Sequence, residues 1–343
     1  MKPRQRVAGA LARGTFDRLP IKHLAVAQVD RRLSEQLGVS SNEDLLDRLG
    51  HDFREIRPVY RGPDFGNMDS EHGCISGTVL ARSLTAQRPS GLADIDSPAD
   101  LESVSFEFAD WYDYSSVRQQ CADALNYATI LGYCEGDFIN GQSGLRGGFE
   151  QVYVDIGLAE PVYIEMIERR FRAVFAHLER GLVAGQGRID FVHFGEDLGS
   201  QAAPLFGVQT YRNLFGAKYR SFFDLAHRHG ARTMMHICGS AAEFIPTLIA
   251  DGLDVLDVVQ TSAAGMDLAE LKRRFGHELA FAGTFCVQHV LPHGTIEEVR
   301  EETRRRLDLF ADGGLIFGPS HQIQPDAPVE NILTMYETAG GIR

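Results

Sequence analysis

Four short apolar runs in the last third of the chain, each preceded by a glycine, constrain the fold most strongly. The runs are TMMHIC (233–238), LDVV (256–259), LAFAG (279–283) and LIFGP (315–319). The glycines before them are Gly230, Gly252, Gly276 and Gly313. A glycine there takes the left-handed conformation that ends a helix. Continuous apolar strands separated by amphipathic helices predict a parallel sheet covered on both faces.

Three earlier segments extend the pattern, namely LPIKHLAV (19–26), ATILGYC (128–134) and DFVHF (190–194), and an eighth strand is unassigned. The count predicts an α/β protein with the (β/α)8 TIM-barrel fold, built as a single domain over residues 1–343. The rival is a doubly wound open sheet, but no G-x-G-x-x-G follows a strand. Residues 53–98 are rich in Gly, Pro, Asp and Ser. They predict a hairpin-like N-terminal excursion that would cover the mouth of the barrel as a lid.

The charge balance excludes some partners. The 343 residues carry 47 acidic and 34 basic side chains, a net charge of −13. Nucleic acids and anionic membranes are therefore not expected as partners, because both bind clustered Lys and Arg. No apolar run approaches a membrane span, the basic N-terminus lacks the apolar core of a secretion signal, and the five cysteines are odd in number. We expect a cytoplasmic protein, with a homodimer left open.

Polar side chains that follow the strands should meet at the C-terminal face of the barrel, where such enzymes carry their active sites. His236 and Cys238 are two residues apart, which places both side chains on one face of an extended chain. Imidazole and thiolate are zinc ligands, and zinc needs at least three protein ligands. His321 and Cys286 follow other strands and could complete the site. The alternative is a hydrogen-bonded histidine beside a thiol that only packs.

Carboxylates and amides follow two further strands. Glu196 and Asp197 are adjacent, so in a strand they would point to opposite faces, one of them toward the barrel lumen as acid, base or metal ligand. The alternative is that both cap the following turn. Gln260 follows the run LDVV. We take Glu196, Asp197 and Gln260 as the candidate catalytic residues.

The runs FGEDLGSQ (194–201), MMHICGSAAEF (234–244), FAGTFCVQHVLPHGTIEEV (281–299) and GLIFGPSHQIQPD (314–326) resemble the uroporphyrinogen decarboxylase superfamily. That superfamily includes zinc-dependent, cobalamin-linked methyltransferases. The decarboxylases carry an Arg-Gln-Ala-Gly-Arg run and a Phe-Ser-Asp-Ile run, and neither stands here. The methyltransferase branch has a His-x-Cys pair, matched by His236 and Cys238, and a third Cys, whose place His321 takes.

The resemblance implies a zinc-dependent methyltransferase that moves a methyl group between a corrinoid (methylcobalamin) on a carrier protein and a small-molecule methyl donor or acceptor. The implied metal ligands are His236, Cys238 and His321. The first alternative is a decarboxylase-like carboxy-lyase acting on a tetrapyrrole or another carboxylate. The second is a non-catalytic barrel that binds a corrinoid or its carrier.

Overall fold

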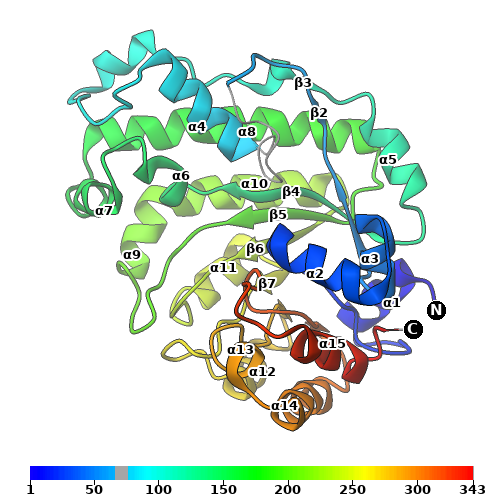
Figure 1. Ribbon diagram of the computed structural model, residues 1–343. Coiled ribbons are helices and arrows are strands. Elements are labelled where there is room, and N and C mark those ends of the chain that lie inside the picture. The colour runs from blue at the N-terminus through cyan, green and yellow to red at the C-terminus, as the bar shows by residue number, and fades with distance from the viewer. Residues whose placement is uncertain (66–75, 343) are drawn as a thin grey trace.

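A curled parallel sheet of seven strands forms the centre of the molecule (Figure 1), a computed structural model that describes residues 1–65 and 76–342. The strands lie side by side in chain order. They are β1 (Phe53–Ile56), β4 (Ala128–Gly136), β5 (Phe191–Gly195), β6 (Arg232–His236), β7 (Val255–Asp257), β8 (Ala280–Ala282) and β9 (Leu315–Ile316). All neighbouring pairs are parallel, as the predicted TIM-barrel fold requires.

The predicted first strand links the two edges of this sheet. Ile21 forms parallel bridges both to His51, ahead of β1, and to Phe317, after β9. The N–H of Phe317 donates to the carbonyl of Pro20 over 2.7 Å, and the N–H of Lys22 donates back to the carbonyl of Phe317 over 2.8 Å. Residues 20–22 thus complete the ring of strands as an eighth, very short element.

Two apolar layers hold the barrel. Inside, each of the seven strands contributes at least one buried apolar side chain, β4 contributes two, and Val7 of α1 joins them. This inner cluster consists of Val7, Phe53, Ala128, Ile130, Phe191, Met234, Val255, Ala282 and Ile316. Outside, the sheet packs against its helices, and α8 and α10 run along β4, β5 and β6 (Figure 1). The lumen is filled by side chains, as in other barrels of this kind.

The helices follow the predicted alternation. They are α1 (Pro3–Leu11), α2 (Ala27–Leu37), α3 (Asn42–Arg48), α4 (Ser76–Gln87), α5 (Val117–Asp123), α6 (Asn140–Ser143), α7 (Phe149–Leu158), α8 (Pro161–Gly185), α9 (Val208–Tyr211), α10 (Ala217–Arg228), α11 (Ile245–Asp251), α12 (Leu268–Phe275), α13 (Val290–His293), α14 (Ile296–Leu309) and α15 (Val329–Thr338). No helix within residues 1–65 and 76–342 is long and apolar enough to cross a membrane.

The limits of the predicted excursion are wrong. Residues 53–56 form β1, the unassigned barrel strand, which pairs with β4. The excursion begins only after β1, and its short strand β2 (Val59–Tyr60) pairs antiparallel with β3 (Tyr112–Asp113), beyond the predicted limit. The run ISGTVLARSL belongs largely to helix α4. The charged residues Arg54 and Glu55 interrupt the apolar residues of β1, so this strand lacks the continuous apolar run that marks the others. Cys74 and the rest of 66–75 lie outside the described residues.

The helix-ending glycines follow the prediction at three of four positions. Gly230, Gly252 and Gly313 have φ of 79°, 109° and 93°, in the left-handed region. Gly276 instead has φ of −60°, so that prediction is wrong. Crowding excludes a side chain at Gly276, because an added Cβ would lie 3.1 Å from the Cγ of Lys272 and closer still to the carbonyl oxygen of Lys272.

Candidate metal centre

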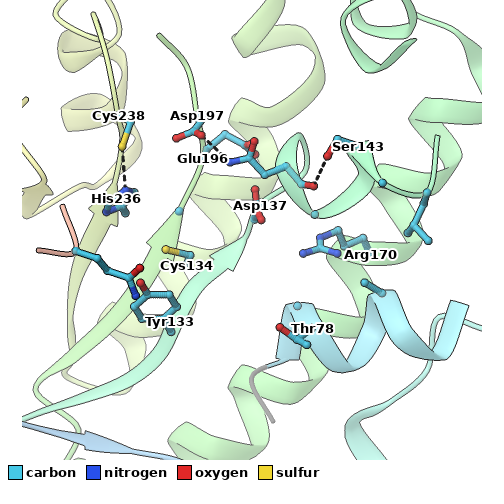
Figure 2. Close-up of a pocket in the computed structure, with 18 of the residues that line it drawn as sticks. Thr78, Tyr133, Cys134, Asp137, Ser143, Arg170, Glu196, Asp197, His236 and Cys238 are labelled. Atoms are coloured by element: carbon cyan, nitrogen blue, oxygen red, sulfur yellow. Dashed lines mark hydrogen bonds between the residues drawn. The ribbon is translucent and has the colours of Figure 1, made fainter. Parts of the chain in front are cut away.

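A cavity of about 720 Å³ opens at the C-terminal ends of β4, β5 and β6 (Figure 2). Side chains that follow these strands form one wall, and helices α4, α6 and α8 form the other. The volume lies in the range of small-molecule sites. The candidate catalytic and metal-binding residues were expected at this face.

The structure brings His236, Cys238 and His321 together at this cavity. Their ligand atoms all lie within 4.8 Å of one another. The Nε2 of His236 is 3.2 Å from the Sγ of Cys238, and the rings of His236 and His321 are 5.7 Å apart between centroids. His236 is the last residue of β6, so the rigid strand fixes the first two ligands. His321 arrives from the loop after β9.

This donor set fits zinc. Two imidazoles and a thiol are ligands that zinc prefers, and tetrahedral bonds of about 2.0–2.3 Å place ligand atoms roughly 3.3–3.8 Å apart. The measured 3.2 Å and the 4.8 Å limit bracket that range. Burial lowers the pKa of His236 to about 4, which keeps the imidazole in its neutral, metal-binding form. Burial raises the pKa of Cys238 to about 12, so the thiol keeps its proton until a cation displaces it.

A buried ionic network lies beside His236. The Oδ2 of Asp257 accepts from the Nζ of Lys22 at 2.7 Å and from the Nε2 of His193 at 2.8 Å. The Nδ1 of His193 accepts from the backbone N–H of Cys134, so the proton of this imidazole lies on Nε2. Burial opposes ionisation of Asp257, but Lys22 and His193 outweigh it and lower the pKa of that carboxyl. The network ties together the ends of three strands and the segment that closes the barrel.

Glu196 and Asp197 both line the cavity instead of pointing to opposite faces. The carboxylate of Glu196 accepts the backbone N–H groups of Phe138 and Ile139 at 2.8 and 3.1 Å. That of Asp197 accepts from the side chain of Asn140 at 2.7 Å. Because β5 ends at Gly195, the alternation of a strand no longer applies to these two residues. Burial raises the pKa of Glu196 well above its usual value, and its hydrogen bonds hold the turn after β4.

Gln260 and Cys286 lie outside the ligand cluster. The Oε1 of Gln260 accepts the N–H of Gly239 at 2.8 Å, and its amide donates to Gln201. Gln260 therefore supports the loop beside Cys238 and is not among the residues that line the cavity. Cys286 is buried and does not join the three ligands.

The sequence reasoning missed several residues that line the cavity. Cys134 lies near the end of β4 and Asp137 directly after it, and this strand was predicted without attention to the polar residues at its end. The same strand-end rule would have found them. Arg82 and Arg170 come from helices α4 and α8. A search of the residues that follow strands cannot find residues that lie on helices.

Fold and site together define an α/β barrel with a His–Cys–His cluster at its C-terminal mouth. Residues 197–341 match the model of the uroporphyrinogen decarboxylase (URO-D) family. The methylated-thiol–coenzyme M methyltransferase of Methanosarcina mazei is 24% identical over 133 residues, 39% of this chain and 33% of that protein. A solved methyltransferase structure from Methanosarcina mazei covers 99% of this chain and 98% of its own, at a TM-score of 0.63 and 14% identity.

These comparisons confirm the resemblance to the URO-D superfamily and its methyltransferase branch, and the structural likeness confirms the fold. The matched segment 197–341 includes all three residues of the His–Cys–His cluster. The chain matches only a third of the curated relative's length, so the substrates of that enzyme are not assigned to this chain.

Proposed function

We propose that the chain is a zinc-dependent methyltransferase that moves a methyl group between a corrinoid on a carrier protein and a small substrate. The observation that carries the proposal is the convergence of His236, Cys238 and His321 on one point of the cavity wall. Three protein ligands and an open position toward a cavity are typical of catalytic zinc. The match to methyltransferases of the same superfamily supports the reaction type.

Zinc bound there would supply a positive charge that favours the thiolate form of a substrate thiol at neutral pH. The chain itself supplies position and environment. The end of β6 fixes His236 and Cys238, and the network around Asp257 holds the neighbouring His193 in one tautomer. Asp197, at the cavity wall, is the candidate acid or base, whereas the hydrogen bonds of Glu196 and Gln260 suit positioning roles.

A carboxy-lyase is the second candidate, and one observation favours it. Arg82 and Arg170 line the cavity and would suit the carboxylates of a tetrapyrrole. Two arginines are few for a substrate with eight carboxylates. Formation of coproporphyrinogen from uroporphyrinogen by the purified protein would support this reading over the first.

The proposal is tested by metal analysis and by transfer of the methyl group of methylcobalamin to small thiols. Wild-type protein should hold close to one zinc ion per chain and demethylate methylcobalamin. Cys238→Ala and His321→Ala should lose both properties, because two remaining ligands hold zinc weakly. Cys286→Ala is the matched control, since it removes a buried thiol outside the cluster. Metal-free wild-type protein, or equal zinc in all variants, would contradict the proposal.

A further inference from the structure

Arg170 on helix α8 differs from the other buried arginines. Within residues 1–65 and 76–342, five arginines are buried, and four of them form an ion pair with at least one carboxylate. Those four are Arg6, Arg54, Arg146 and Arg306. Arg170 is 2% exposed and forms no ion pair among the described residues. A buried charge without a counter-ion is costly, so a partner from outside the described residues is expected.

The guanidinium of Arg170 is held rigidly at the cavity wall. Its Nε donates to the carbonyl of Gly136 over 2.6 Å. A Cβ on Gly141 would lie 2.7 Å from its Cζ, so the backbone of α6 packs directly on the group. The Nη1 atom is buried and has no hydrogen-bond partner in the described structure. The guanidinium points toward the side of the cavity that holds Asp137 (Figure 2).

Two carboxyl groups lie near Arg170 without pairing to it. Burial raises the pKa of Glu135 to about 7 and that of Asp137 to about 6, and the charge of Arg170 opposes both shifts. Glu135 instead accepts a hydrogen bond from the hydroxyl of Ser76. The Oδ1 of Asp137 is buried and has no hydrogen-bond partner either. Neither carboxyl group therefore forms a direct ion pair with Arg170 among the described residues.

We propose that Arg170 is an anion subsite, and that the small substrate carries a carboxylate that binds the part of the guanidinium that lines the cavity. The role of the other end of that substrate, facing His236 and Cys238, rests on the methyltransferase proposal. The subsite itself does not, because it follows from a rigid, unpaired guanidinium in a cavity. A carboxylate is the natural partner, since it accepts directed hydrogen bonds from the planar guanidinium.

The test is an NMR titration of the full chain with propionate and with its neutral isostere propionamide, without any methyl donor. Propionate should bind about 10–100-fold more tightly, the range expected for a charge-assisted hydrogen bond. Arg170→Gln should abolish this preference and Arg170→Lys should retain part of it. Arg172→Gln should leave it unchanged, because Arg172 is a 58% exposed neighbour on the same helix. Ethanesulfonate tests whether the subsite prefers a carboxylate over a sulfonate.

Cys238→Ala separates this subsite from the metal centre. If Arg170 binds the anion, the variant keeps the preference for propionate even though it loses zinc. Loss of the preference there would place the anion on the metal and overturn the proposal. Equal binding of propionate and propionamide by the wild type would overturn it too. That wild-type comparison decides the matter if Arg170→Gln fails to fold. Propionate selectivity without methyl transfer would uphold the subsite and refute only the proposed reaction.

Discussion

Zinc binding to His236, Cys238 and His321 should release close to one proton per ion near pH 8. Burial raises the pKa of Cys238 to about 12, so only about one thiol in 10⁴ is ionised at pH 8. The metal binds the thiolate and must displace that proton. Burial lowers the pKa of His236 to about 4, so this imidazole is already neutral and releases none.

The apparent zinc affinity should therefore rise about tenfold per pH unit between about pH 7.5 and 9, which is about 1.4 kcal/mol per unit. This window lies above the ordinary range of imidazole titration and below the pKa of Cys238. The affinity is measured by competition with a chromophoric chelator at several pH values, corrected for the protonation of the chelator. Calorimetry in buffers of different ionisation enthalpy gives the proton count independently.

Cys238→Ala should bind zinc more weakly and lose the pH slope, whereas Cys286→Ala should keep both affinity and slope. Cys286 is a suitable control because it is another cysteine that follows a barrel strand, and it lies outside the ligand cluster. A wild-type affinity that does not change with pH would refute the reasoning, since it would mean that no thiol proton is displaced. An unchanged slope in Cys238→Ala would show that another group supplies the proton.

Two further predictions concern stability, measured by urea unfolding. Asp257→Asn should cost about 3–5 kcal/mol, because it breaks the buried ion pair with Lys22, whereas Asp110→Asn in an exposed pair should cost under about 1 kcal/mol. Since folding lowers the pKa of Asp257, the contribution of this carboxylate to stability is present above about pH 4 and is lost as the pH falls through the pKa of the folded state. Equal losses of stability in Asp257→Asn and Asp110→Asn would contradict the prediction. Phe222→Ala, in the aromatic cluster between α8, α10 and β5, should cost about 3–5 kcal/mol. Phe149→Ala, half exposed on α7, should cost far less, and similar losses would argue against tight packing at Phe222.

The barrel could be predicted from local patterns. Buried parallel strands are continuous apolar runs, and helix ends carry local signals such as the capping box of Thr295 and Glu298, which the structure contains. Even the short strands β7, β8 and β9 were found, because each lies in a mainly apolar run. The strand β1 was not, because the charged residues Arg54 and Glu55 interrupt its apolar residues.

The candidate site was predictable only where its members are close in the chain or follow a strand. The spacing of His236 and Cys238 placed both on one face because side chains alternate along an extended backbone. The sequence also suggested His321, since all strands of a barrel end at the same face. The sequence could not establish that a ring nitrogen of His321 lies within 4.8 Å of the ligand atoms of His236 and Cys238, because the loop after β9 determines that distance.

Tertiary structure alone decided the electrostatics of the cavity. The pKa shifts of Cys238 and His236 arise from burial, which depends on contacts among segments far apart in the chain. Arg170 looks in sequence like any other charged residue of a long amphipathic helix. Only the folded chain turns it inward, packs α6 against it and leaves Nη1 without a partner. Sequence thus determined the barrel and the placement of two candidate metal ligands, whereas burial and long-range packing determined the environment of the charged groups in the cavity.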